Sequence, residues 1–256
     1  MAKREDQIVV FDSGVGGISV LRALVKKLPR ENYLYFGDSA NAPYGTRPTE
    51  EIRRLTLERI AALCTTNVKA VVVACNTATS AAIEDLRAAY PDKIIIGIEP
   101  ALKPAADRFP GKTILVMATE ATLREEKFSH LMAQCESRCK IVSIPCPELV
   151  EAVERGETDS PLLEQALRRK LTPHLNGDTA AIVLGCTHFP FARDLIARIA
   201  GEKVCLIDGS DGTAGQTMRR LETENLLNLT GEGSVSLQNS RPSIEMLTLM
   251  GTLLEQ

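Results

Sequence analysis

The sequence VVVACNTATS at residues 71–80 decides how the rest of the chain is interpreted. Its valines and alanine predict a strand that is buried on both faces of a parallel sheet. Cys75 then stands at the carboxyl end of that strand, which is where open α/β sheets bind ligands. The polar residues that follow it are good N-caps for a helix expected over residues 81–89. Because a helix N-terminus favours an anion, we expect the pKa of Cys75 to be lowered.

A second stretch repeats this arrangement later in the chain. The sequence AIVLGCTH at residues 181–188 again runs from an apolar strand into a cysteine and a threonine, and a helical pattern follows over residues 191–199. Both cysteines would then stand at carboxyl ends of strands and against helix N-termini. The two stretches together predict that Cys75 and Cys186 face one ligand.

Composition and charge bound the class of protein. The chain has 256 residues, of which 44% are hydrophobic and 25% charged, as in soluble globular proteins. Its net charge of -3 gives no electrostatic reason to expect nucleic acid or an anionic membrane as a partner. No apolar run approaches the length of about 18 residues that suggests a membrane span, and none near the N-terminus suits a signal peptide. We therefore expect a cytoplasmic protein whose seven cysteines are reduced.

The chain alternates between strand and helix patterns, which predicts mostly parallel sheets covered on both faces, the α/β class. Strands are expected at 8–11, 33–36, 69–74, 93–97, 112–117, 140–144, 180–184 and 203–207. Helices are expected at 18–28, 49–64, 81–89, 101–108, 123–134, 147–155, 162–171 and 191–199. This number of units favours two sheets, divided near residues 98–100. For the tail we expect a helix at 216–225, a strand at 234–237 and a helix at 242–254.

Polar residues at other strand ends are further candidates for a site. Asp12 and Ser13 follow the first strand and precede a glycine-rich turn. Residues 38–45 form a loop with strong turn chemistry after the second strand. A helix predicted to start at Cys146-Pro147 carries two glutamates three residues apart, Glu151 and Glu154, which therefore share a side.

These stretches together resemble the cofactor-independent aspartate/glutamate racemase superfamily, and within it the glutamate racemases. The resemblance is carried by residues 12–17, 38–45, 74–80, 97–100, 146–147 and 185–190. It implies two pseudo-symmetric open parallel-sheet domains with the active site in the cleft between them. It also implies that the tail returns to the first domain, which gives residues 1–98 with 208–256 and residues 99–207. Two departures are Phe189, where members often have tyrosine, and the last twenty residues, which match little.

The resemblance also implies an activity and a set of site residues. The activity is interconversion of L- and D-glutamate without cofactor or metal, which supplies D-glutamate for peptidoglycan synthesis. Aspartate or a related acid is the alternative substrate, and a homodimer remains open. The implied catalytic residues are Cys75 and Cys186 as proton-transfer groups, Asp12 assisting the first, and His188 with Glu154 assisting the second; Glu151 is the rival of Glu154. The implied substrate-binding residues are Asp12, Ser13, Tyr44, Gly45, Asn76, Thr77, Thr187 and His188.

The residue types suit that chemistry. Inverting an amino acid at Cα needs a base on one face and an acid on the other, and a thiol can serve as either. A free cysteine, with a pKa of about 8.5, is only a few per cent thiolate at neutral pH, so a carboxylate and a histidine that take the protons would help. The motifs offer almost no lysine or arginine for an acidic substrate, only Arg47. They offer helix N-termini and backbone N–H groups, which bind anions without a cation.

Two other functions are open from the sequence. Residues 14–17 after a strand are typical of a dinucleotide-binding turn, although Ser19 occupies the third glycine position and Asp12 would repel a pyrophosphate. A zinc site would use Cys135, Cys139, Cys146 and His130, although no second tight cysteine pair is present.

Overall fold

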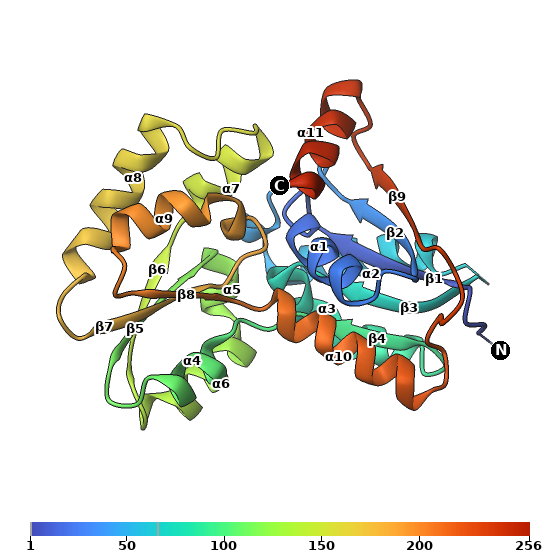
Figure 1. The fold of residues 1–256 in the computed structure, drawn as a ribbon, viewed down its shortest axis with the longest axis horizontal. Coiled ribbons are helices and arrows are strands. Elements are labelled where there is room, and N and C mark those ends of the chain that lie inside the picture. The colour runs from blue at the N-terminus through green and yellow to red at the C-terminus, as the bar shows by residue number, and fades with distance from the viewer. Residues whose placement is uncertain (1, 66) are drawn as a thin grey trace.

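Figure 1 shows the computed structural model of the protein, in which two sheets lie side by side, each flanked by helices. The structure describes residues 2–65 and 67–256. Within these residues the first sheet has five parallel strands in the order β4-β3-β1-β2-β9. Its strands are β1 (Gln7–Asp12), β2 (Asn32–Gly37), β3 (Val68–Val73), β4 (Ile94–Gly97) and β9 (Ser234–Asn239).

The second sheet has four parallel strands among the described residues, in the order β6-β5-β7-β8. Its strands are β5 (Thr113–Ala118), β6 (Lys140–Pro145), β7 (Thr179–Leu184) and β8 (Cys205–Asp208). The predicted class, two open parallel sheets of an α/β protein, is confirmed. The residue boundaries of the two domains stay a prediction.

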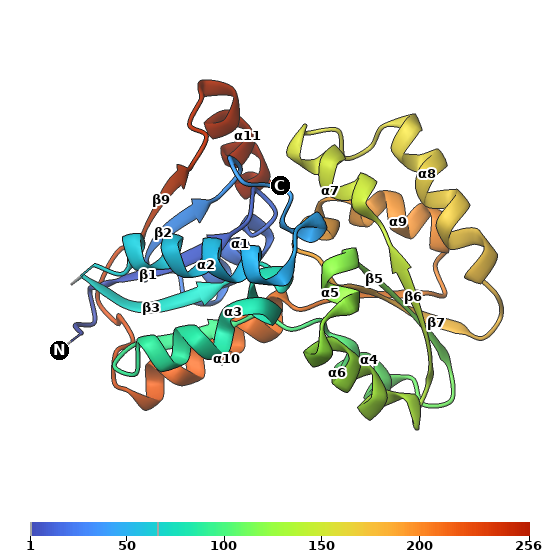
Figure 2. The ribbon, with the colours of Figure 1, turned by 180° about the vertical axis from the view of Figure 1, so that it is seen from behind.

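Helices cover both faces of each sheet, as the opposite views in Figures 1 and 2 show. Around the first sheet lie α1 (Ile18–Lys27), α10 (Ser210–Thr223) and α11 (Ile244–Glu255) on one face and α2 (Thr49–Leu63) and α3 (Asn76–Ala89) on the other. Around the second lie α4 (Leu102–Arg108), α5 (Glu120–Arg124), α6 (Glu126–Glu136), α7 (Pro147–Glu154), α8 (Pro161–Leu171) and α9 (Arg193–Ala200). Short 3-10 turns span Tyr44–Thr46, Thr172–His174 and Phe189–Ala192.

Alternation along the strands explains this layering. In β1, Ile8 and Val10 pack toward α1, while Val9 and Phe11 pack toward α2 and α3, and all four are fully buried. Burying both sets of side chains removes apolar surface from water at about 25 cal/mol per Å². A strand without polar alternation is therefore stable only in the middle of such a sandwich of helices.

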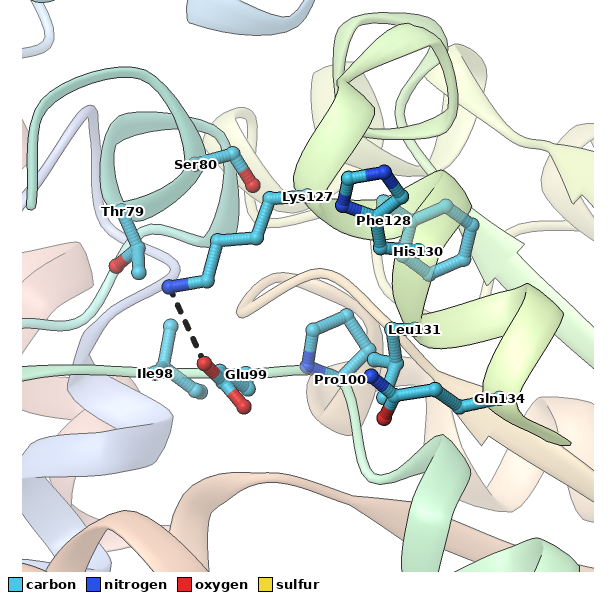
Figure 3. Close-up of a pocket in the computed structure, with 10 residues that line it drawn as sticks. All are labelled: Thr79, Ser80, Ile98, Glu99, Pro100, Lys127, Phe128, His130, Leu131 and Gln134. Atoms are coloured by element: carbon cyan, nitrogen blue, oxygen red, sulfur yellow. Dashed lines mark ion pairs between the residues drawn. The ribbon is translucent and has the colours of Figure 1, made fainter.

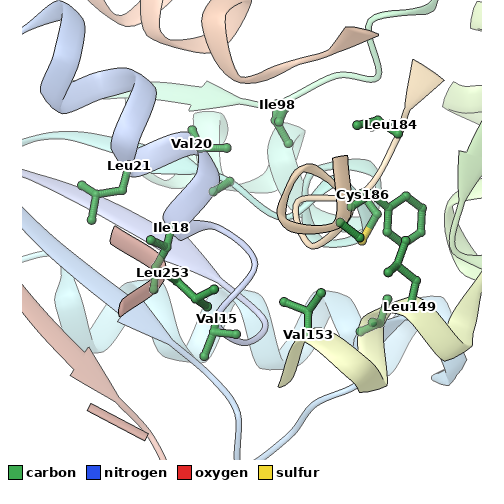
Figure 4. Close-up of a cluster of buried hydrophobic side chains, with 14 of the residues drawn as sticks. Val15, Ile18, Val20, Leu21, Ile98, Leu149, Val153, Leu184, Cys186 and Leu253 are labelled. Carbon is green, nitrogen blue, oxygen red and sulfur yellow. The ribbon is translucent and has the colours of Figure 1, made fainter. Parts of the chain in front are cut away.

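We call the first sheet with its helices the first half of the molecule and the second sheet with its helices the second half. One hydrophobic cluster is shared by both halves. Figure 4 shows Val15 and Ile18 of the first half in the same cluster as Leu149 and Val153 of α7 in the second. Val15 and Val153 are fully buried. The cluster holds the carboxyl ends of the two sheets against each other, which is where the sequence places its polar strand ends.

The structure corrects three predicted helices. The helix expected over 81–89 begins at Asn76, because the sulfur of Cys75 accepts a hydrogen bond from the backbone N–H of Ala78 and caps the first turn. The helix expected over 123–134 is two helices, α5 and α6, separated by Glu125 in an extended conformation. The helix expected over 216–225 begins at Ser210, whose N–H is capped by the carboxylate of Asp208.

The tail returns to the first sheet. The strand expected at 234–237 forms and extends to Asn239 as β9, which pairs in parallel with β2 along its whole length. After β9, α11 packs on α1 through Met250 and Leu253, both of which are buried. Across residues 2–65 and 67–256, no helix combines the length and hydrophobicity needed to cross a membrane.

Candidate active site

Each sheet has a point where its strand order reverses, and the two points face each other. In the first sheet it lies between β1 and β3, whose carboxyl ends carry Asp12 and Cys75. In the second it lies between β5 and β7, whose carboxyl ends are followed by Thr119 and Cys186. Crevices at such switch points are the usual ligand sites of open α/β sheets. The two halves therefore place equivalent strand-to-helix junctions, which we call corners, around one shared space.

Cys75 is a buried thiol at the start of α3. It donates a long hydrogen bond to the hydroxyl of Ser13, 3.5 Å away, and accepts one from the N–H of Ala78 at 3.4 Å. Burial, and after it the nearby charge of Asp12, raise the pKa of Cys75 to about 12. The expectation of a lowered pKa is therefore wrong in this structure, because desolvation outweighs the helix N–H group.

Cys186 belongs to a second, differently charged arrangement. Its sulfur lies 3.6 Å from Nδ1 of His188, and Nε2 of His188 lies 2.7 Å from Oε1 of Glu154. Burial lowers the pKa of His188, but its hydrogen bonds to Cys186 and Glu154 outweigh burial and hold that pKa well above its usual value. Burial alone would raise the pKa of Glu154, yet His188 and the N–H of Val15 lower it overall. The geometry thus favours an imidazolium between a thiol and a carboxylate.

Asp12 is fully buried and accepts hydrogen bonds from both halves. Its Oδ1 accepts a hydrogen bond from the N–H of Gly14 at 2.9 Å, and its Oδ2 accepts one from the hydroxyl of Thr187 at 3.0 Å. Burial raises its pKa, and the nearby His188 partly offsets that rise. Asp12 therefore has one hydrogen bond within its own half and one to the second half, and it influences Cys75 through charge.

A cavity of about 110 Å³ lies between the two corners and receives both cysteines. All the predicted site residues line it except Asp12, which lies behind it; the residues lining it are Ser13, Ala42, Pro43, Tyr44, Gly45, Thr46, Cys75, Asn76, Thr77, Thr119, Glu120, Pro147, Val150, Glu151, Glu154, Cys186, Thr187 and His188. The predicted pair of thiols facing one space is thus brought together by the fold.

Sequence reasoning missed Thr119. It directly follows β5, and its hydroxyl lies 3.0 Å from that of Thr77 across the two halves, with the hydroxyl of Thr122 3.2 Å from Thr77. Its position after a strand could have indicated it, because Cys75 and Cys186 were predicted from the same position at the ends of their strands. It was overlooked because no cysteine accompanies it.

Two predicted substrate-binding residues differ in their freedom to bind. Oδ1 of Asn76 is buried and has no hydrogen-bond partner among the described residues. The hydroxyl of Tyr44, by contrast, donates to Asp38 at 2.8 Å. Asn76 therefore offers a free acceptor at the cavity, whereas Tyr44 contributes mainly its ring.

Gly14 and Gly16 are required by the close approach of the second half. A Cβ atom on Gly14 would lie 1.9 Å from Oε1 of Glu154, and one on Gly16 would lie 2.4 Å from Nδ1 of His188. The glycine-rich turn is therefore filled by side chains of the second half. It has no room for a pyrophosphate, so the dinucleotide-binding interpretation is wrong for this turn.

The four residues of the alternative zinc site are not brought together. Cys135 and Cys139 pack in the cluster beneath α4 and α6, whereas Cys146 belongs to the cluster on the other face of the sheet. His130 is exposed and lies 3.7 Å from Glu126. A single ion could not bind all of them.

A second hollow lies at the crossover between the halves. Figure 3 shows it between α3, residues 98–100 and α6, with Lys127 paired to Glu99 at 3.2 Å. Neither Cys75 nor Cys186 lines it. The paired thiols therefore mark the other cavity as the candidate active site.

A sequence model of the Asp/Glu/Hydantoin racemase family matches residues 8–217. The chain belongs to this family. It is 52% identical to a glutamate racemase of Clostridium novyi over 231 residues, which cover 90% of this chain and 89% of that one. It is 47% identical to a glutamate racemase of Clostridium acetobutylicum over 256 residues, with both chains fully covered.

Solved structures of the family share the fold. Glutamate racemase from Thermus thermophilus, in complex with beta-chloro-D-alanine, superposes with a TM-score of 0.83 at 35% identity, covering 98% of this chain and 94% of that one. Glutamate racemase from Escherichia coli, in complex with L-glutamate and the activator UDP-MurNAc-ala, gives a TM-score of 0.85 at 28% identity, covering 98% and 95%. The superfamily inferred from the sequence motifs is thereby confirmed.

Proposed function

We propose that this member of the racemase family interconverts L- and D-glutamate by proton transfer at Cα between two thiols, without a cofactor. The observation that carries the proposal is that Cys75 and Cys186 enter one cavity from opposite halves. The choice of glutamate is supported by relatives named glutamate racemase at 44–52% identity over 90% or more of this chain. Aspartate or a related acid is the alternative substrate.

In the direction from L-glutamate, the thiolate of Cys186 takes the proton from Cα. The Cα–H bond breaks, its electron pair delocalises into the carboxylate, and the thiol of Cys75 delivers its own proton to the opposite face. Cys75 is left as thiolate and Cys186 as thiol, so the site is then set for D-glutamate. The assignment of each cysteine to one enantiomer follows the family resemblance.

The two assisting groups, His188 and Asp12, give the two thiols different electrostatic surroundings. His188, held as an imidazolium by Glu154, stabilises the thiolate of Cys186. Among the described residues no cation influences the thiol of Cys75, and its raised pKa keeps it protonated at neutral pH, so that it holds a proton to deliver. Asp12, whose own pKa is raised by burial, can exchange a proton with Cys75 between turnovers.

Substrate recognition would rely on neutral donors. No lysine or arginine occurs among the residues that line the cavity in the part of the chain that the structure describes. Hydroxyls of Ser13 and Thr77 and the N-terminus of α3 remain for the carboxylates, whereas the hydroxyl of Thr187 already donates to Asp12. The unpartnered Oδ1 of Asn76 suits the substrate ammonium.

The experiment that tests the proposal follows all four enantiomers of glutamate and aspartate by chiral chromatography, with and without a chelator. We expect L- and D-glutamate to interconvert at rates that the chelator leaves unchanged. Faster turnover of aspartate would keep the reaction and change the substrate, whereas activity restored only by added metal would overturn the two-thiol chemistry. An enzyme of this kind would supply D-glutamate to peptidoglycan synthesis in the cytoplasm.

A further inference from the structure

A series of hydrogen bonds runs from β9 of the first sheet to Glu154 and His188, the pair of residues next to Cys186. The side-chain amide of Asn239 donates to the hydroxyl of Ser39 at 2.9 Å, and that hydroxyl donates to Oε2 of Glu154 at 3.3 Å. The other oxygen of Glu154 holds His188, which in turn contacts Cys186. Ser39 and Asn239 have no part in the chemistry described so far.

The direction of these bonds is fixed by the partners at each end. Oδ1 of Asn239 accepts the backbone N–H of Arg241 at 2.8 Å, so its NH2 group is the end that faces Ser39. A hydroxyl that accepts from an amide has its one hydrogen free to donate, and Glu154 is its acceptor. Asn239 is only 7% exposed, so water does not readily replace it.

The pairing of β9 with β2 puts this path in place. In its register Asn239 lies opposite Gly37, two residues before Ser39. The next residue, Ser240, reinforces the pairing, because it donates its N–H to the carbonyl of Gly37 and accepts the N–H of Ala40. The loop that carries Ser39 is therefore held by the tail of the chain.

Resting on the proposed function, we propose that Ser39 and Asn239 are positioning residues that hold Glu154 so that His188 stays aligned on Cys186. Glu154 comes from α7 in the second half, while Ser39 and Val15 come from the first half. The alignment is thus made where the halves meet. Without Asn239 the hydroxyl of Ser39 is free to turn, and Glu154 loses a donor on one oxygen.

The test compares wild type with Ser39→Ala, Ser39→Thr and Asn239→Ala. The matched control is Asn228→Ala, which removes the same amide from another buried asparagine, bonded to Arg30 and Gly231 and outside the site. Losing one hydrogen bond to a charged group predicts a fall in kcat of about tenfold for Ser39→Ala and somewhat less for Asn239→Ala. We expect Ser39→Thr to retain most activity, because it keeps the hydroxyl.

Isotope effects separate positioning from general damage. A racemase has an equilibrium constant of about one, so kcat/KM must stay equal in both directions whatever is substituted. If transfer at Cys186 becomes slower, the effect of deuterium at Cα grows for L-glutamate, where that step breaks the bond, and shrinks for D-glutamate. Asn228→Ala should lower the melting temperature but leave both isotope effects unchanged.

A second readout does not depend on activity. The chain has three histidines, so the titration of the His188 imidazole can be followed by NMR and assigned with His188→Asn. We expect its pKa to fall in Ser39→Ala and Asn239→Ala. If wild type does not racemise glutamate, the proposed function fails while this titration still tests the positioning. Folded variants with wild-type titration and isotope effects would overturn the inference.

Discussion

Oε1 of Glu154 lies 2.7 Å from Nε2 of His188, and the same oxygen accepts the N–H of Val15 from the other half of the molecule at 2.8 Å. One carboxylate thus joins the two sheets and orients the imidazole next to Cys186. In the described part of the chain, Cys75 has no comparable cation nearby and instead lies close to the charge of Asp12. The two corners, at Cys75 and at Cys186, are therefore similar in geometry but different in charge.

Removing the imidazole should impair catalysis more than folding. General acid–base assistance is typically worth about 10²–10⁴-fold, so we expect His188→Asn to lower kcat by that order. Glu154→Gln, which keeps the shape but not the charge, should cost about tenfold or more. The measurement is steady-state kinetics with thermal unfolding as the control. A larger loss from Glu151→Gln than from Glu154→Gln would show that Glu151 is the assisting acid.

Stability should depend on pH through His188. Its pKa is raised in the folded protein, so protonation stabilises the fold. That contribution is fully present below the unfolded pKa of about 6.5 and is lost as the pH rises through the folded value. We expect the difference in free energy of unfolding between wild type and His188→Asn to shrink as the pH rises from about 6.5 through the folded pKa of His188. Urea unfolding across this range measures it, and a difference that grows would contradict the raised pKa.

Asp12→Asn should make Cys75 more reactive while lowering turnover. The carboxylate of Asp12 adds to burial in raising the pKa of Cys75, so its removal increases the thiolate fraction. Alkylation of Cys75 by iodoacetamide at about pH 8, followed by peptide mass spectrometry, should therefore be faster in the variant. Turnover should fall nonetheless, because the group that exchanges the proton is gone. Slower alkylation in a folded variant would argue against the charge effect.

Gly14→Ala should disturb the pair formed by Glu154 and His188. Its Cβ would lie 1.9 Å from Oε1 of Glu154, so that carboxylate must move away from His188. We expect the pKa of His188 to fall and kcat to drop by at least tenfold. Gly177→Ala is the matched control, since its Cβ would have no neighbour within 4 Å among the residues that the structure describes. Equal behaviour of the two variants would mean that Glu154 can shift without consequence.

The fold was largely predictable because its strands are apolar and its strand ends polar. Every expected strand forms within a few residues of its predicted bounds, including the tail strand, which becomes β9. The start of α3 was misplaced by five residues, because a cysteine is not a usual N-cap and only its burial next to Ala78 makes it one. Periodicity alone could not reveal that.

The sequence could predict which residues line the cavity, but not the hydrogen bonds among them. Cys75, Cys186 and His188 line one cavity as expected, and Glu154 rather than Glu151 reaches His188. The bond from Thr187 to Asp12 depends on how the halves face each other, which no local pattern encodes. The raised pKa of Cys75 likewise depends on burial in the assembled cleft rather than on its helix.

The most direct test of the two-thiol account is racemisation of L-glutamate in heavy water, stopped in the first few per cent of conversion and analysed by chiral separation and mass spectrometry. The account predicts D-glutamate that carries deuterium at Cα from the first turnover, because Cys75 has exchanged with solvent. It also predicts that the remaining L-glutamate keeps its hydrogen, because Cys186 returns the captured proton before exchanging. D-glutamate that retains the substrate hydrogen would mean that one base carries the proton across, and would contradict the account.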